Sequence, residues 1–258
     1  MTDIRELILY RNFENGKVLE DMTWIMEHFN QKECTEEVGD RFFSCMHELI
    51  ELAAQYGFEQ NLWQTYLTFL LVNNENSFST ACEIRGISDC SLLNLARHDF
   101  AIFRELFAYD FTDLERTLQA GFFEELLRYR REETSGKLFN HRIRDRICSL
   151  SKELAAADTL EGFTESMVEF YREFGVGTLG LHKAFRVAHD ESGVRIEPIT
   201  NIRHVNLEDL VGYEIAKQKL IDNTEAFVQG RRANNCLLFG DAGSPNAVAN
   251  AACARFLP

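Results

Sequence analysis

The sequence predicts a mainly α protein: a multi-helix N-terminal domain, a short β-hairpin connector, and then the first helix–strand–helix of an α/β module. Apolar residues recur with helical spacing in successive stretches up to about residue 174. No proline, which breaks helix interiors, occurs before Pro198. After Gly175-Val176-Gly177 the pattern changes to short apolar runs separated by turn residues. We therefore expect a helical domain at 1–176, a connector at 177–204 and the C-terminal segment at 205–258.

Helices are expected on both sides of Asn15-Gly16, the first from about Asp3 and the second from about Lys17 to Phe29. The third should run from about Thr35 to Tyr56, because threonine followed by two glutamates suits a helix N-terminus and Gly57 suits its end. Its apolar face comprises Val38, Phe42, Cys45, Met46, Leu49 and Ala53. A fourth helix carries Leu62, Trp63, Tyr66, Leu67, Leu70 and Leu71.

Two shorter helices should follow, separated near Gly86, and Asp99 is expected to open the next one. Thr112 and Glu115 form the pattern of a capping box, which predicts that Thr112 caps a further helix. Three more helical segments complete the domain. The first has an apolar stripe made of Phe122, Phe123, Leu126 and Leu127, and the second is a basic helix over 137–146. The last long helix has an apolar face made of Phe163, Met167, Phe170, Tyr171 and Phe174.

The connector has the pattern of a β-hairpin. Apolar and polar residues alternate over 184–188 and again over 194–196, with a glycine-containing turn at 190–193 between them. Pro198 should close the second strand, since proline cannot continue the interior of a paired strand.

Composition limits the partners. The formal net charge of -14 argues against nonspecific binding to nucleic acid or to an anionic membrane, so neither is expected. The start, MTDIRELILY, lacks the basic and apolar regions of a secretory signal, and the apolar runs are too short to span a membrane. Seven scattered cysteines include no C-x-x-C pair, and no histidine has a convincing metal-ligand spacing. A cytoplasmic protein with reduced thiols, without a metal site, is expected.

A glycine-rich loop follows a short apolar run in the C-terminal segment. Cys236-Leu237-Leu238-Phe239 suits a buried strand, and Gly240-Asp241-Ala242-Gly243-Ser244 supplies the first five positions of the phosphate-binding pattern G-x-x-x-x-G-K-[ST]. Pro245, Asn246 and Ala247 then replace the second glycine, the lysine and the magnesium-binding hydroxyl. The pattern thus loses a cation, a metal ligand and one backbone donor.

The stretch from Val205 to Ser244 resembles the start of an AAA+ P-loop ATPase module. The combination NTEAFVQGRRANNCLLFGDAG is similar to an uncharacterised bacterial family of predicted AAA+ ATPases with an N-terminal helical region, as are Gly180–Arg186 and Ile196–Ile199. The resemblance implies ATP and magnesium as cofactors and places Val211 and Gly212 near adenine. Alternatively, Leu207, Leu210 and Val211 merely fasten the helix onto the sheet. The implied cofactor-binding residues are Val211, Gly212, Gly240, Asp241, Ala242, Gly243, Ser244 and Asn246.

Because three decisive positions are changed, ATP binding should be weak or absent, and we assign no catalytic residue. We expect the N-terminal portion of an AAA+ protein, with the rest of the ATPase core missing after Pro258. The alternative is a noncatalytic helical interaction module that keeps a vestigial nucleotide segment. Either could form a homo-oligomer or bind a protein partner through the helical domain. Basic residues are concentrated in one part of the chain, at Arg128, Arg130, Arg131, Lys137, Arg142, Arg144 and Arg146. This basic concentration is either a contact surface for a partner or a helix face that is exposed to solvent.

Overall fold

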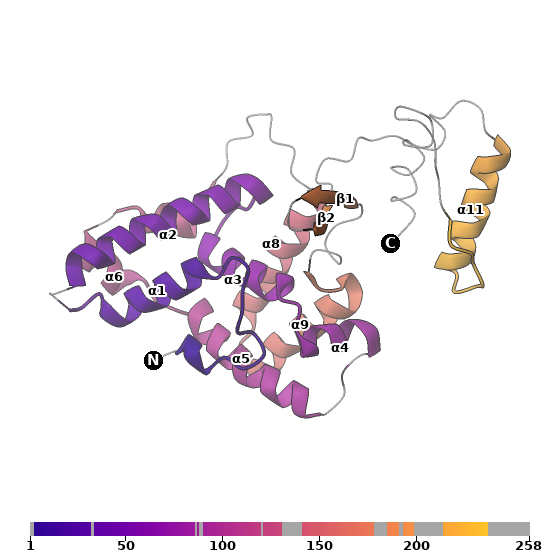
Figure 1. The fold of residues 1–258 in the computed structure, drawn as a ribbon. Helices are drawn as coiled ribbons and strands as arrows, with labels where there is room; N and C mark the ends of the chain where they lie inside the picture. The colour runs from indigo at the N-terminus through magenta and orange to yellow at the C-terminus, as the bar shows by residue number, and fades with distance from the viewer. Residues whose placement is uncertain are drawn as a thin grey trace. The chain divides into compact units, whose positions relative to one another are not determined.

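The protein is mainly helical (Figure 1). The computed structural model describes residues 3–31, 34–85, 87, 90–119, 121–130, 141–177, 185–190, 193–198 and 214–236. Contacts divide the chain into two compact units, Met1–Leu181, hereafter the helical unit, and His182–Pro258, the C-terminal unit. The helical unit contains a 3₁₀ turn at Ile4–Glu6 and helices α1 (Lys17–His28), α2 (Thr35–Tyr56), α3 (Leu62–Asn73), α4 (Ser77–Arg85), α5 (Ser91–Phe107), α6 (Thr112–Leu118), α7 (Phe123–Leu127), α8 (His141–Ala156) and α9 (Leu160–Phe174).

Helix α3 forms the centre of the helical unit. Ten of its twelve residues are buried, including Trp63 and Tyr66, and a helix that is apolar on all sides requires neighbours on all sides. It contacts α2, α5, α7 and α8. The polar ends of its aromatic residues are satisfied: Trp63 Nε1 donates to the Leu106 carbonyl at 2.9 Å, and the Tyr66 hydroxyl donates to the Asn15 carbonyl at 2.7 Å.

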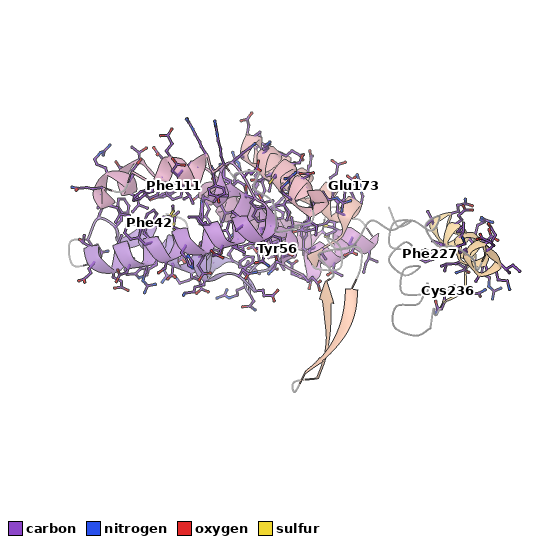
Figure 2. All side chains as sticks on the ribbon, turned by 90° about the horizontal axis from the view of Figure 1, so that it is seen from above. Phe42, Tyr56, Phe111, Glu173, Phe227 and Cys236 are labelled. Atoms are coloured by element: carbon purple, nitrogen blue, oxygen red, sulfur yellow. The ribbon has the colours of Figure 1, made fainter. Side chains whose placement is uncertain are left out.

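Amphipathic helices cover this centre. α1 pairs with α2, while α9 packs against α4, α5 and α8. The expected face of α2 is confirmed at five of its six positions, since Val38, Phe42, Cys45, Leu49 and Ala53 are buried, while Met46 is half-buried. Aromatic contacts join helices that are distant in sequence, as where Phe42 of α2 stacks on Phe123 of α7 with ring centroids 4.6 Å apart. Figure 2 shows side chains filling the space between these helices.

The ends of α2 illustrate how local sequence sets helix boundaries. Gly57 takes a left-handed conformation with φ of 75°, and its N–H donates to the Ala53 carbonyl at 2.8 Å. At the other end Cys34 occupies the cap position without a side-chain hydrogen bond, and Thr35 is already helical. The predicted span is confirmed.

The prediction that Asp99 opens a helix is wrong. Asp99 lies fully buried in the middle of α5, which runs unbroken from Ser91 to Phe107. Its carboxylate accepts backbone N–H groups from Ile8, Leu9 and Tyr10 at 2.7–2.9 Å. These contacts also explain why the expected first helix is only the 3₁₀ turn Ile4–Glu6: the following N–H groups donate to Asp99 and not to a helical ladder.

The predicted capping box at Thr112 is also not formed. α6 begins at Thr112 as expected, but no side-chain cap hydrogen bond is present at its N-terminus. Instead Asp110 Oδ1 accepts both the backbone N–H and the hydroxyl of Thr112, at 2.9 Å and 2.6 Å. The aspartate two residues upstream holds the turn that the threonine was expected to hold.

The described part of the C-terminal unit consists of two strands and one helix. β1 (Phe185–Asp190) pairs antiparallel with β2 (Gly193–Pro198), and the register places Phe185 opposite Pro198. Helix α11 (Glu214–Val228) follows. Across the parts of the chain that the structure describes, no helix combines the length and apolar character needed to cross a membrane.

Candidate functional site

The implied nucleotide-binding residues lie outside the described part of the chain. This applies to Val211, Gly212, Gly240, Asp241, Ala242, Gly243, Ser244 and Asn246. Their placement therefore stays a prediction. Of the same stretch, the structure describes α11 and the chain that follows it as far as Cys236.

The end of α11 is closed by a glycine motif. Gly230 has φ of 68°, the Arg231 N–H donates to the Ala226 carbonyl at 2.8 Å, and the Gly230 N–H donates to the Phe227 carbonyl at 3.0 Å. This pair of hydrogen bonds is the Schellman motif, which a left-handed glycine makes possible. It turns the chain back along the helix.

Asn223 then holds the returning chain. Its Nδ2 donates to the Asn234 carbonyl and its Oδ1 accepts the Asn234 N–H, both at 2.8 Å. A side-chain amide that pairs both ways with one backbone residue imitates a step of a β ladder. The pair fixes Asn234 two residues before Cys236, the first residue of the run that leads to the glycine loop.

A groove between α8 and α9 is a second candidate, and it lies wholly within the helical unit. It has a volume of about 700 Å³. Its floor is apolar, with Leu150 and Phe170 buried and Phe174 half-buried. The remaining lining is polar and mostly acidic: Asp145, Arg146, Ser149, Glu153, Ser166, Glu169 and Glu173. No sequence pattern predicted a groove between these helices.

Several arginines of the predicted basic concentration contact groups of the helical unit. Arg128 pairs with Glu124 at 3.0 Å, and Arg144 pairs with Asp145 at 2.6 Å. The Arg146 guanidinium lies over the Phe174 ring at 3.9 Å from its centroid. The side chains of Arg131, Lys137 and Arg142 lie outside the described residues.

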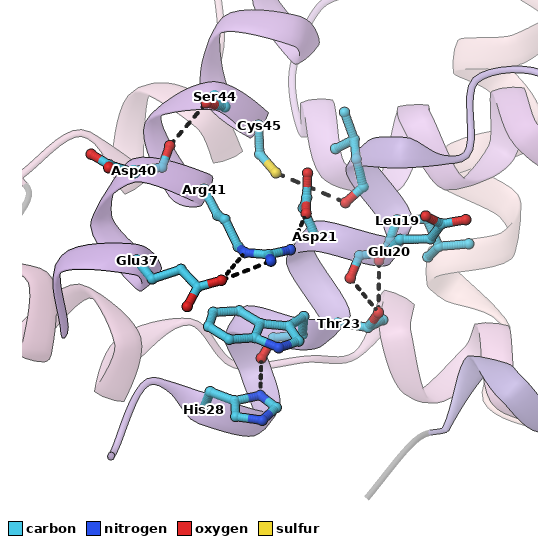
Figure 3. A network of polar contacts seen from close by, with 12 residues as sticks. Leu19, Glu20, Asp21, Thr23, His28, Glu37, Asp40, Arg41, Ser44 and Cys45 are labelled. Atoms are coloured by element: carbon cyan, nitrogen blue, oxygen red, sulfur yellow. Dashed lines mark hydrogen bonds and ion pairs between the residues drawn. The ribbon is translucent and has the colours of Figure 1, made fainter. Parts of the chain in front are cut away.

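A polar network joins α1 to α2 (Figure 3). Arg41 donates to Asp21 at 2.6 Å and to Glu37 at 2.8 Å, and its guanidinium lies 4.3 Å from the centroid of the Trp24 ring. His28 stacks on the same ring at 4.4 Å and contacts the Trp24 carbonyl through Nδ1. The Arg41 guanidinium is thus held by carboxylates from both helices, so the network fastens α1 to α2.

Buried titratable groups in the helical unit are likewise structural. The hydroxyls of Tyr10 and Tyr171 lie 2.9 Å apart, and Tyr171 donates to the Leu71 carbonyl at 2.7 Å. Burial raises the pKa of both phenols well above the ordinary value, so both remain neutral even in alkaline solution. Burial also raises the pKa of the Cys45 and Cys82 thiols to about 12, which makes them poor nucleophiles.

Among the described residues, no group of three or more histidine, cysteine or acidic side chains could hold a metal ion. The cysteines at 34, 45, 82, 90, 148 and 236 are free thiols.

Comparison with known proteins finds one family whose sequence pattern matches part of this chain. Residues 180–255 match a family described as "Protein of unknown function (DUF815)". The match includes both strands, α11 and the glycine-rich loop. No curated protein and no solved structure matches this chain.

Proposed function

We propose that residues 205–258 form the opening helix, strand and loop of an AAA+-type nucleotide-binding module that does not turn over ATP. The observation that carries the proposal is the run of three changed residues, Pro245, Asn246 and Ala247, directly after a matching glycine loop. Two further findings support it. The family match covers most of this stretch, and the Asn223–Asn234 pair holds the chain that follows α11 two residues before the apolar run begins.

The expected loss of affinity follows from the missing groups. Losing a hydrogen bond to a charged group costs about 1.5–3 kcal/mol, or roughly one to two decades in affinity for each contact. The loop lacks the lysine, the hydroxyl that holds magnesium, and the N–H that Pro245 removes. Even with non-additivity, micromolar binding in an intact loop falls to millimolar or weaker here.

Titration with a fluorescent ATP analogue in the presence of magnesium tests this proposal. We expect no saturable binding in the low micromolar range. A variant with Pro245→Gly, Asn246→Lys and Ala247→Ser serves as the matched comparison, and it should bind more tightly than the unmodified chain, because it restores the cation, the hydroxyl and the N–H. Saturable, magnesium-dependent binding by the unmodified chain would refute the proposal.

The second candidate function is noncatalytic binding of a protein partner by the helical unit, with a cytoplasmic location. The groove between α8 and α9 favours this role, because it combines an apolar floor with charged side chains at its edge. The free thiols of the described cysteines agree with a reducing compartment. A pull-down with the full chain, and with a chain whose residues 240–247 are replaced by a glycine-serine loop, tests the role. The same partner should be retained by both baits; loss with the replaced loop would assign binding to the C-terminal unit instead.

A further inference from the structure

The groove between α8 and α9 carries carboxylates from both helices. Glu153 lies on α8, and Glu169 and Glu173 lie one turn apart on α9, all three exposed. Glu173 is labelled at the surface of the helical unit in Figure 2. Carboxylates that line both sides of one groove produce a negative potential along it, which attracts a cationic group.

Two of the groove's carboxylates form no ion pair with the residues that the structure describes. Glu169 pairs with Arg172 at 3.2 Å, and Asp145 pairs with Arg144. Within the described residues no ion pair involves Glu153, which accepts only the Ser149 hydroxyl at 3.1 Å, or Glu173. Arg146, the cation in the lining, lies over the Phe174 ring. As far as the described residues go, the groove therefore presents two carboxylates outside any ion pair, Glu153 from α8 and Glu173 from α9.

The apolar floor adds a second requirement for an occupant. Leu150, Phe170 and Phe174 form it and offer apolar contact. A groove between two helices with an apolar floor accepts the apolar side of an amphipathic helix. Its acidic sides then select basic residues at the edges of that helix.

The net charge of this chain decides between a second copy and a different protein. At -14, two copies repel each other over distances comparable to the Debye length, whereas a basic protein is attracted. We infer that the α8–α9 groove binds a cationic amphipathic helix of a partner protein, with leucine-like side chains on the floor and Lys or Arg against Glu153 and Glu173. This inference rests on the partner-binding role proposed above and names the chemistry of the partner.

A designed peptide probes the groove in the full chain. The probe is a fluorescein-labelled 15-residue helix with leucines on one face and lysines along its edges. Fluorescence anisotropy should show saturable binding that weakens with salt. The double variant Glu153→Lys/Glu173→Lys should weaken binding by roughly a hundredfold, about tenfold for each lost charge-assisted contact. Ser166→Trp, which fills the groove without a charge change, should also weaken it about tenfold or more.

The matched control changes the same charge elsewhere. Glu51→Lys/Glu125→Lys alters two exposed carboxylates on α2 and α7 and should leave binding within about twofold. Equal weakening in both double variants, equal binding of a scrambled peptide of the same composition, or no saturable binding would overturn the inference. A dimer of the unmodified chain that Glu153→Lys/Glu173→Lys dissolves would also overturn it, in favour of a second copy. If the groove variant still retains a partner captured by the unmodified chain, the groove assignment fails while the partner-binding role stands.

Discussion

Replacement of Asp99 tests the long-range contact that organises the start of the chain. Asp99 is fully buried, and three backbone N–H groups donate to it: Ile8 to Oδ1 at 2.9 Å, Leu9 to Oδ2 at 2.7 Å and Tyr10 to Oδ2 at 2.9 Å. Asp99→Ala leaves these donors without an acceptor. An unsatisfied buried donor costs about 1–3 kcal/mol. Ile8 is 48% exposed, so water can replace that contact in part.

The N–H groups of Leu9 and Tyr10 should each cost the full penalty of an unsatisfied donor. Asp99→Ala should therefore lower the free energy of unfolding by about 3–5 kcal/mol, a large share of the stability of an ordinary domain. Asp99→Asn should cost only about 1–2 kcal/mol, because one amide oxygen at the Oδ2 position still accepts from both residues. Urea unfolding followed by circular dichroism at 222 nm measures both. Asp113→Ala, at an exposed ion pair with Arg116, is the control and should change stability by less than about 0.5 kcal/mol. A cost below about 1 kcal/mol for Asp99→Ala would refute the reasoning.

Two further predictions concern the helical unit. Gly177 has φ of 67°, and a Cβ there would lie 2.7 Å from Cγ of Glu75, so Gly177→Ala should destabilise by about 1–2 kcal/mol from backbone conformation alone, plus the clash. Adding Glu75→Ala should recover only the clash; full recovery in thermal melts would show that the backbone conformation is unimportant. Burial raises the pKa of Cys45 and Cys82 to about 12, so at pH 8 both should resist an aromatic disulfide reagent until the protein unfolds, whereas exposed Cys90 reacts at once. Because folding raises the pKa of these two thiols, their protonated form stabilises the folded protein fully below about pH 8.5, and this contribution declines as the pH rises toward 12. Rapid reaction of the buried thiols at pH 8 would contradict their burial.

Helical periodicity in the sequence predicted most of the helical unit. The apolar stripe Phe163, Met167, Phe170 and Tyr171 is buried along α9, as its spacing required. Periodicity succeeds because helix burial follows a fixed repeat of 3.6 residues, which a single sequence displays directly.

Contacts between residues distant in sequence could not be predicted from local patterns. The carboxylate of Asp99 bonds to residues about 90 positions away, and no local pattern indicates that a mid-helix aspartate will be buried. Local cues placed a helix start at Asp99 because aspartate favours N-caps. Tertiary contact overrode that preference, and it also removed the first predicted helix.

The candidate sites show the same difference between local patterns, which the sequence displays, and contacts between separate helices, which it does not. The glycine loop was visible as a motif, since its residues are contiguous, but those residues lie outside the described part of the chain. The groove was missed because its carboxylates come from two helices. The spacing of Glu169 and Glu173, one turn apart, was the local signal that could have marked its α9 side.

Direct measurement of ATP turnover by the purified full chain tests the central claim most plainly. Phosphate release with ATP and magnesium should not exceed that of a chain carrying Gly243→Val, because neither has the lysine and hydroxyl that bring charge to the transferred phosphate. We predict equal rates for the two proteins, both at the level of buffer alone. Magnesium-dependent release by the unmodified chain that Gly243→Val abolishes would contradict the account.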